Sequence, residues 1–173
     1  AVYGITRPVR TWNPIKINFM HLWLLIKDAW RAKSWKDKIR IWLMPTGWRP
    51  TDVAEKYPVY KIEDVYHFEK YDTGHTKPMV IWSWVQLSTT LLLISYLFGN
   101  ITAIGNPDMF IYGAFIFLHV YAFTELMDRS KHAWIWEGLK TIFGFWILIP
   151  NNDWFGLSQL IPFIVPILSG YFV

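Results

Sequence analysis

The side chains in this sequence best suited to binding a metal or moving a proton are its five histidines, His21, His67, His75, His119 and His132. Metal ligands supplied by one helix need to stand three or four residues apart so that they share a face, and no two of these histidines do. The sequence also lacks a phosphate-binding loop, a glycine-rich dinucleotide turn and a nucleophile elbow. The residues themselves therefore predict no catalytic, cofactor-binding or metal-binding position in this chain.

His119 has the most unusual surroundings, because it lies inside a long apolar stretch. A polar side chain inside a membrane usually faces the interior of a helix bundle, and we interpret His119 as a hydrogen-bonded packing residue. Glu137 and Lys140 are three residues apart, so a mutual ion pair on one helix explains both charges. Since no charged partners are expected at mid-depth, a small transporter or channel is a weak interpretation.

Glu125, Asp128, Arg129, Lys131 and His132 gather at the end of the stretch that contains His119. The basic members could bind a lipid head group, whereas paired charges could simply anchor the helix end at the membrane surface. Both interpretations stay open at this point, and Arg129, Lys131 and His132 are candidate head-group contacts.

Charge and apolarity are unevenly divided between the two halves of the chain. Of the 17 Lys and Arg, 14 precede Met79, together with eight of the 13 acids, so the first 78 residues carry a net charge of +6 and the rest −2. The chain of 173 residues is 53% hydrophobic with 12 Trp, more apolar surface than one water-facing globule can hide. Because the basic residues alternate with Trp, Leu and Ile, we expect membrane lipids as partners and no nucleic acid.

Four apolar stretches follow one another from Met79 onward, and each is a predicted membrane crossing. They are residues 79–98, 109–127, 133–149 and 154–173. A hydrocarbon core of about 30 Å needs about 20 helical residues, which the first two stretches supply almost without charge. The third contains Glu137 and Lys140, and the fourth is interrupted by Pro162 and Pro166, so these two could instead form a re-entrant or tilted pair.

The loops between these stretches predict an orientation. Residues 99–108 and 150–153 contain no Lys or Arg, whereas the turn after residue 127 contains Arg129 and Lys131. The positive-inside rule then places the N-terminal region, this turn and the C-terminus in the cytoplasm. Tryptophans near the predicted span ends, Trp154 among them, suit the membrane interface.

The first 78 residues are predicted to contain amphipathic helices in the plane of the membrane surface. Residues 15–32 carry an apolar stripe, with Asp28 on the solvated surface, and a second helix begins at Ser34, whose hydroxyl is expected to cap it with Asp37. Lys, Arg and Trp beside an apolar face are typical of an interfacial helix, although such faces could also pack on another protein domain. The predicted lipid or head-group contacts in this half are Trp23, Trp30, Arg31, Trp35 and Lys38.

Pro45, Gly47 and Pro50 break the chain after the second helix, and residues 51–78 are expected to form an extended cytoplasmic strap. The sequence thus predicts an all-α membrane protein with two regions. Residues 1–78 form a basic, amphipathic, interfacial region, and residues 79–173 form a transmembrane region of about four helices.

Three stretches of the N-terminal half form a recognisable pattern. Residues 2–16 read VYGITRPVRTWNPIK, residues 34–40 read SWKDKIR, and residues 44–50 read MPTGWRP. Together they resemble the region that follows the catalytic core in the sterol desaturase/fatty acid hydroxylase superfamily, particularly in its bacterial, alkylglycerol monooxygenase-like members. The resemblance is tight through Pro50 and of general character beyond it.

Members of that superfamily are membrane oxidoreductases that use O2 and a non-haem di-iron centre, held by HxxxH and HxxHH motifs, to oxidise lipids. This sequence contains none of those motifs, so the resemblance transfers no iron ligand to any of its positions. It implies a C-terminal portion whose di-iron cofactor is held by a catalytic segment upstream of Ala1 or by another membrane subunit. It also implies an integral protein of the bacterial cytoplasmic (inner) membrane, for which the loop charges predict that both termini are cytoplasmic.

Two functions are consistent with these patterns, and the residues leave open whether the chain is itself an enzyme. The leading hypothesis is the C-terminal membrane portion of a di-iron lipid hydroxylase or desaturase-like oxidoreductase. The alternative is a non-catalytic accessory membrane subunit that stabilises or anchors a larger membrane complex.

Overall fold

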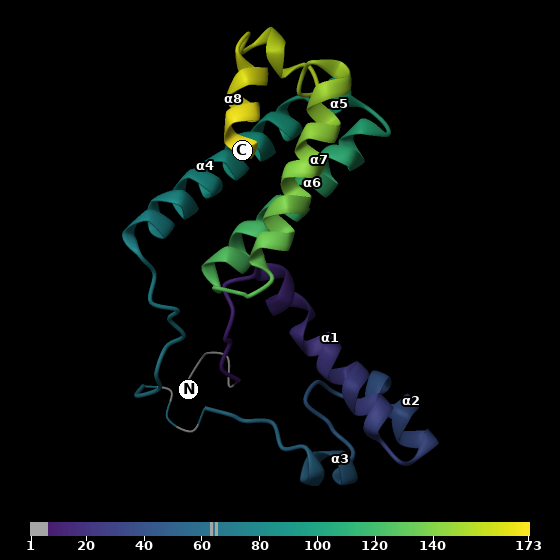
Figure 1. Ribbon diagram of the computed structural model, residues 1–173. Coiled ribbons are helices and arrows are strands. Elements are labelled where there is room, and N and C mark those ends of the chain that lie inside the picture. The colour runs from purple at the N-terminus through teal and green to yellow at the C-terminus, as the bar shows by residue number, and fades with distance from the viewer. Residues whose placement is uncertain (1–6, 63, 65) are drawn as a thin grey trace. The chain divides into compact units, whose positions relative to one another are not determined.

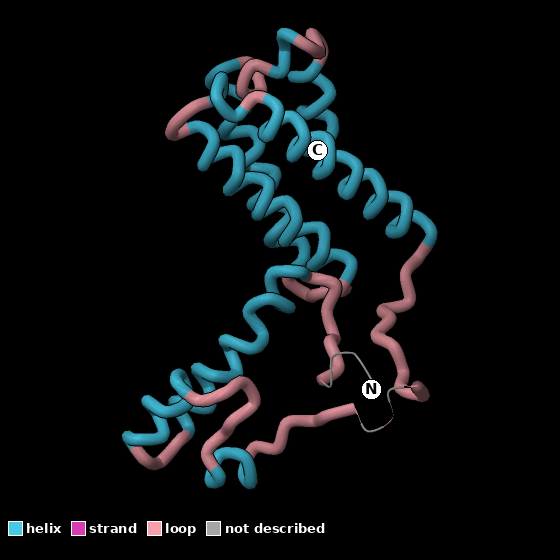
Figure 2. The backbone as a smooth tube through the Cα atoms, turned by 180° about the vertical axis from the view of Figure 1, so that it is seen from behind, coloured by secondary structure: helices cyan, strands magenta, loops and turns pink. Residues whose placement is uncertain are grey.

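The computed structural model describes residues 7–62, 64 and 66–173, and every regular element among them is a helix (Figure 1 and Figure 2). The elements are α1 Pro14–Arg31, α2 Trp35–Leu43, α3 Thr51–Lys56, α4 Lys77–Gly99, α5 Ile101–Ile104, α6 Asp108–Met127, α7 Ala133–Asn151, the 3-10 helix η1 Leu157–Gln159, and α8 Ile164–Phe172. They belong to two compact units, Ala1–Asp72 and Thr73–Val173, called the N-terminal and C-terminal units below. The predicted all-helical fold is confirmed for the described residues, which exclude the beginning of the 2–16 motif.

α1 forms where the sequence predicts it, one residue earlier at each end. Its N-cap is Asn13, whose side-chain oxygen accepts hydrogen bonds from the backbone N–H groups of Ile15 (3.0 Å) and Lys16 (3.3 Å). Pro14 occupies the first turn, where a missing N–H removes no helical hydrogen bond. Arg31 lies in the last turn, where a cation is favoured by the helix dipole.

α2 also forms at its predicted place, but the predicted capping by Ser34 is wrong. The Ser34 side chain makes no capping hydrogen bond, and only its carbonyl oxygen accepts from the N–H groups of Asp37 and Lys38. A reciprocal capping box needs the longer Glu or Gln at the position of Asp37. Asp37 instead lies 3.8 Å from Arg40 on the helix surface.

The predicted extended strap, residues 51–78, begins with a helix. α3 follows directly after Pro50, which serves as its N-cap residue. The side chain of Asp52, in the first turn, accepts a hydrogen bond from the N–H of Lys33 at 3.1 Å and so ties α3 to the connection between α1 and α2. Pro50 was expected only to break the chain, but a residue without an N–H also fits the start of a helix.

Arg49 connects the segment between α2 and α3 to α1. Its Nε and Nη2 atoms donate to the two carboxylate oxygens of Asp28 at 2.5 and 2.9 Å, and its Nη1 donates to the carbonyl oxygen of Tyr57 at 2.9 Å. Asp28 is 1% exposed, so its predicted place on the solvated surface is wrong. The reason is that the segment after α2 folds back and brings a guanidinium against the carboxylate, which makes burial of that charge acceptable.

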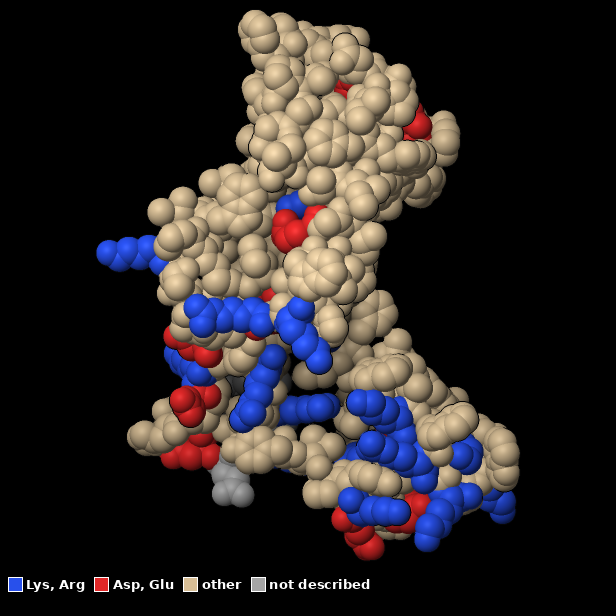
Figure 3. Space-filling view, viewed as in Figure 1, with Lys and Arg blue, Asp and Glu red and all other residues tan. Residues whose placement is uncertain are grey.

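Two of the described helices, α4 and α6, are long and apolar enough to cross a membrane. Large apolar side chains are exposed along both, including Leu92 and Phe98 on α4 and Phe117 on α6. The view in Figure 3 shows few charged atoms over the C-terminal unit, whereas Lys and Arg gather over α1, α2 and α3. An apolar surface of that extent is unusual for a protein surrounded by water.

The predicted count of four membrane crossings is not supported. α7 has 19 residues and packs along α6, but it contains Glu137 and Lys140 and does not reach the apolarity of α4 and α6. In place of the fourth predicted crossing, 154–173, the chain forms η1 and the nine-residue α8. A nine-residue helix is about 14 Å long, roughly half of a hydrocarbon core.

The turn between α7 and α8 explains why the last apolar stretch is divided. The carboxylate of Asp153 accepts hydrogen bonds from the N–H groups of Gly156 (2.6 Å) and Ser158 (2.8 Å), and Gly156 has a φ of 89°. Residues with a Cβ atom rarely adopt a φ of this value, which glycine tolerates. Pro162 then keeps the chain from continuing as a helix until Ile164.

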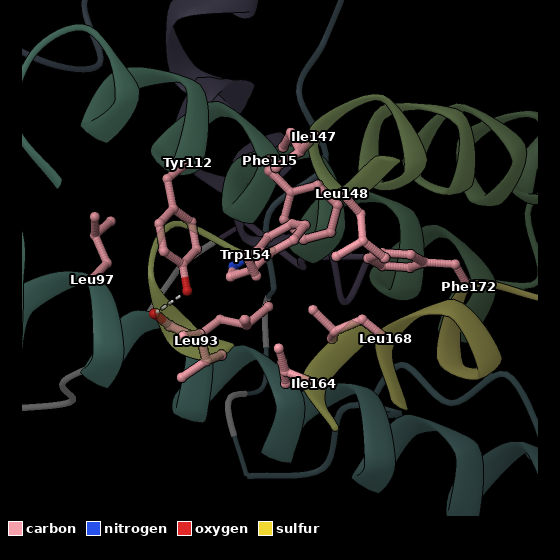
Figure 4. Close-up of a cluster of buried hydrophobic side chains, with 11 residues drawn as sticks. Leu93, Leu97, Tyr112, Phe115, Ile147, Leu148, Trp154, Ile164, Leu168 and Phe172 are labelled. Atoms are coloured by element: carbon pink, nitrogen blue, oxygen red, sulfur yellow. Dashed lines mark hydrogen bonds between the residues drawn. The ribbon is translucent and has the colours of Figure 1, made fainter. Parts of the chain in front are cut away.

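The core of the C-terminal unit lies where α4, α6, α7 and α8 meet (Figure 4). Trp154, fully buried, packs edge-on against Phe115 (ring centroids 4.8 Å apart) and Tyr112 (5.5 Å). The hydroxyl of Tyr112 donates to the carbonyl oxygen of Leu93 at 3.0 Å, the dashed contact in Figure 4. The predicted interfacial place of Trp154 is therefore wrong, because the turn after α7 folds this ring inward.

Candidate functional site

The C-terminal unit contains a cluster of buried and half-buried polar side chains, one or two from each of its four principal helices. The polar cluster consists of Gln86 on α4, His119 on α6, Glu137 and Lys140 on α7, and Tyr171 on α8. Gln86 and His119 have no exposed surface and Lys140 is 2% exposed. Gln86, His119 and Lys140 lie well inside their helices, whereas Tyr171 is the next-to-last residue of α8.

Lys140 provides the positive charge of the polar cluster. Its Nζ donates to the side-chain oxygen of Gln86 at 2.9 Å and to a carboxylate oxygen of Glu137. It also lies 5.5 Å from the centre of the Tyr171 ring, a cation–π distance. The predicted Glu137–Lys140 pair is present, but it is only part of a network that reaches α4 and α8.

His119 contacts two helices other than its own. Its Nε2 lies 3.2 Å from the backbone carbonyl oxygen of Gln86 and 3.3 Å from the hydroxyl of Tyr171. Because a carbonyl oxygen can only accept, the proton of a neutral imidazole must sit on Nε2. The interpretation of His119 as a hydrogen-bonded packing residue agrees with these contacts.

Three polar atoms of the cluster have no hydrogen-bond partner in the structure. They are Gln86 Nε2, His119 Nδ1 and Glu137 Oε1. Gln86 Nε2 is a donor, whereas Nδ1 of the neutral imidazole and Glu137 Oε1 are acceptors. The cluster thus combines an ammonium, a carboxylate and an imidazole with spare hydrogen-bonding capacity, and its contacts between helices suit it to holding them in register.

The described residues of this chain do not fit a di-iron centre. In the part of the chain that the structure describes, no three His, Cys, Asp or Glu side chains come close enough together to hold a metal ion. In the polar cluster, His119 and Glu137 are accompanied by the ammonium of Lys140, whose charge opposes binding of a cation.

The predicted lipid or head-group contacts on α1 and α2 include exposed tryptophan rings and an arginine that lies over the ring of Tyr57. Trp30 is 85% and Trp35 77% exposed, and Trp23 is also exposed, with Lys27 Nζ 5.2 Å from its ring centre. The Arg31 guanidinium lies 4.0 Å from the centre of the Tyr57 ring.

Lys38 has a structural role that the sequence did not reveal. Its Nζ donates to the carbonyl oxygens of Ala29 (3.2 Å) and Trp30 (3.0 Å), so it occupies the C-terminal end of α1. These two hydrogen bonds hold α2 against α1.

The predicted contacts after α6 lie in the short turn before α7. Arg129 has a φ of 52°, and both Lys131 and His132 are exposed. The N–H of Ser130 donates to the carbonyl oxygen of Glu125 at 3.1 Å, which closes the end of α6. These three residues belong to the C-terminal unit, and the others belong to the N-terminal unit.

Sequence reasoning missed Gln86 and Tyr171 as members of the polar cluster. Gln86 is a polar residue amid a long apolar stretch, which is a signal that could have been read in the same way as His119. Tyr171 gave no such signal, because its partners Gln86 and His119 are 85 and 52 residues away in the chain.

Human alkylglycerol monooxygenase is 24% identical to this chain over 146 residues, covering 82% of this chain and 32% of the human protein. The chain therefore spans about a third of the length of that curated relative. No protein-family model and no solved structure matches the chain. Alkylglycerol monooxygenase is a member of the sterol desaturase/fatty acid hydroxylase family. This chain is thus similar to part of a monooxygenase, and two of its described helices are long and apolar enough to cross a membrane.

Proposed function

We propose that this chain is the C-terminal membrane portion of a di-iron lipid hydroxylase or desaturase-like oxidoreductase, and that its catalytic histidines belong to another segment or subunit. The observation that carries this proposal is the extent of the similarity to alkylglycerol monooxygenase. The 146 aligned residues exceed the length of either unit, so the similarity includes residues of both.

In this proposal α4, α6 and α7 cross the membrane and α8 enters it only partway. The 19 residues of α7 are sufficient for a crossing, and its two charges are paired with each other. The positive-inside rule then places the N-terminal unit and the turn with Arg129 and Lys131 on the cytoplasmic side of a bacterial inner membrane.

The polar cluster gives the membrane helices a fixed arrangement. In hydrocarbon, Lys140 and Glu137 are tolerated only when they are paired and hydrogen-bonded, and Gln86 supplies a further acceptor from α4. Sliding or rotating α4 would separate Lys140 from Gln86, and moving α6 or α8 would break the contacts of His119 or Tyr171. The cluster therefore supports a rigid frame beside which a catalytic segment can hold its substrate.

A di-iron centre, when bound by the catalytic segment, would supply O2 activation for oxidising a lipid C–H bond. The described residues of this chain do not fit that centre, and no step of the reaction is assigned to them. Their proposed contribution is to bind and orient: the apolar helices contact lipid, and the polar cluster fixes their spacing.

The first test is the genomic sequence around the reading frame. We expect HxxxH and HxxHH motifs in frame before Ala1 or in an adjacent gene. An ordinary start codon in that place, with no such motifs in the neighbouring genes, would remove the basis of the enzyme interpretation and favour the accessory subunit.

The second test is biochemical and uses the protein with its native surroundings. The chain is tagged at its chromosomal locus, purified from membranes in a mild detergent, and assayed for iron and for O2-dependent consumption of an alkylglycerol. Iron and activity that co-purify with the tag would support the proposal. A stable complex without iron or oxidation of this lipid class would instead identify an accessory membrane subunit.

A further inference from the structure

The N-terminal unit contains a basic cavity of about 650 Å³ at the side of α1. Its positively charged lining residues are Arg7, Arg10, Lys27, Arg31, Arg49 and Lys56. No Asp or Glu is among the described residues that line this cavity. Arg49 is already paired with the buried Asp28, but the described lining offers the other five cations no carboxylate, so the cavity favours negative charge.

The cations are held in place by neighbouring groups. Tyr57, at the end of α3, has the Arg31 guanidinium 4.0 Å and Lys56 Nζ 5.6 Å from the centre of its ring. Arg49 is fixed by its two hydrogen bonds to the buried Asp28. A guanidinium and an ammonium held in advance lose little conformational freedom when they bind an anion.

The rest of the lining is apolar or aromatic, and it continues onto an exposed apolar surface. Trp23 and Leu24 on α1 line the cavity. Phe19 and Trp30, which are near them in the sequence of the same helix, are exposed. An apolar helix surface next to Lys and Arg is typical of a helix that lies at the boundary between head groups and acyl chains. A cavity at that depth meets lipid phosphates before it meets soluble ions.

We propose that this basic cavity binds the phosphate head group of an anionic membrane lipid. Its volume lies within the range of sites for small organic ligands, about 300–1,000 Å³, and exceeds what a bare phosphate needs. The proposal relies on the membrane location in the proposed function but not on lipid oxidation. Its failure and the failure of the oxidoreductase assignment are therefore distinguishable.

The test is native mass spectrometry of the full chain released from nanodiscs of phosphatidylcholine with a minor fraction of phosphatidylglycerol. We expect one retained phosphatidylglycerol per chain. Lys27→Gln/Arg31→Gln removes two cavity cations, and retention should fall about tenfold or more. Lys33→Gln/Lys36→Gln removes the same charge outside the cavity, and retention should stay within about twofold.

The result that overturns the proposal is an equal loss of retention in both double variants, which would indicate attraction by net charge alone. Competition by inorganic phosphate or glycerol phosphate separates the two sources of the anion. If free phosphate displaces the lipid at similar concentration, the site is one for soluble anions. Hydrogen exchange of α1 checks folding, and Arg10→Gln/Lys56→Gln replaces the first variant if α1 is disturbed.

Discussion

The Arg49 guanidinium and the Asp28 carboxylate form two parallel hydrogen bonds, of 2.5 and 2.9 Å, between positions 21 residues apart. This pair joins the turn after α2 to the last third of α1, and its acid is almost fully buried. A carboxylate that is buried this deeply requires its partner, because an uncompensated charge in a low-dielectric site is strongly destabilising.

Arg49→Ala should destabilise the N-terminal unit by about 3 kcal/mol or more, since Asp28 would remain buried and unpaired. Arg49→Lys should recover only part of this loss, because an ammonium cannot form the two-pronged contact. Hydrogen exchange of α1 and limited proteolysis between α2 and α3 measure the effect. Arg40→Ala is the control, since its pair with Asp37 is exposed, and it should change stability by less than about 1 kcal/mol. Equal effects of the two alanine variants would contradict the assigned role of Arg49.

Lys140→Met should destabilise the C-terminal unit by about 3 kcal/mol, because Glu137 and the Gln86 side-chain oxygen both lose their donor. Lys140→Met/Glu137→Leu should recover most of that loss, because no charge is then left unpaired. Unfolding in mixed micelles of increasing denaturing detergent measures both. The exposed Lys131→Met is the matched control and should leave the midpoint unchanged. If the double variant is less stable than the single one, the cluster is not held by charge pairing.

Gly144→Ala should loosen α8. A Cβ at this position would lie 2.6 Å from two atoms of the Phe172 ring, and that ring is confined by Phe115 and Phe145 (ring centroids both 5.7 Å away). Overpacking of this kind costs about 1–3 kcal/mol. Phe172→Leu in the same chain should relieve it.

Gly138→Ala is the matched control for the Gly144 variant, because no atom lies within 4 Å of an added Cβ there. That substitution within α7 should be neutral or stabilising by up to about 1 kcal/mol. Thermal unfolding followed by tryptophan fluorescence distinguishes the two variants. A Gly144→Ala protein as stable as Gly138→Ala would mean that α8 is not packed on α7 as described.

Low pH should destabilise the turn between α7 and α8. Burial raises the pKa of Asp153, but hydrogen bonds from Ser158, Trp154 and Gly156 outweigh it and hold the pKa below its ordinary value of 3.8. A depressed pKa means that the ionised carboxylate stabilises the turn above pH 3.8, and that this contribution is lost as the pH falls through the folded-state value. The protection of the Gly156 and Ser158 amides against hydrogen exchange, relative to the intrinsic rate at each pH, should fall in that range, and Asp153→Asn should remove the acid dependence. An unchanged acid response in that variant would assign the effect to another group.

The helices of this protein were predictable to the extent that their signals are local. The start of α1 follows from Pro14 and the apolar stripe after it, and α4 and α6 follow from apolar stretches of sufficient length with almost no charge. Pro50 showed the limit of local reasoning. Its missing N–H suggested only a break in the chain, but the same feature permits the start of α3.

The polar cluster and the Arg49–Asp28 pair could not be derived from spacing. The partners of Gln86 stand 33, 54 and 85 residues away in the chain, and only packing of separate helices brings them together. Trp154 illustrates the same point: its position near a span end suggested an interfacial ring, but the turn at Asp153 carries it into the core.

The nine-residue α8 also implies an order of assembly. A segment of this length is too short to insert across a bilayer by itself and too short to be stable as an isolated helix. Its docking surface consists of α7 and the rings of α6, including the gap at Gly144 that receives Phe172. α8 can therefore form only after the hairpin of α6 and α7 exists, which makes it the closing piece in the biogenesis of this unit.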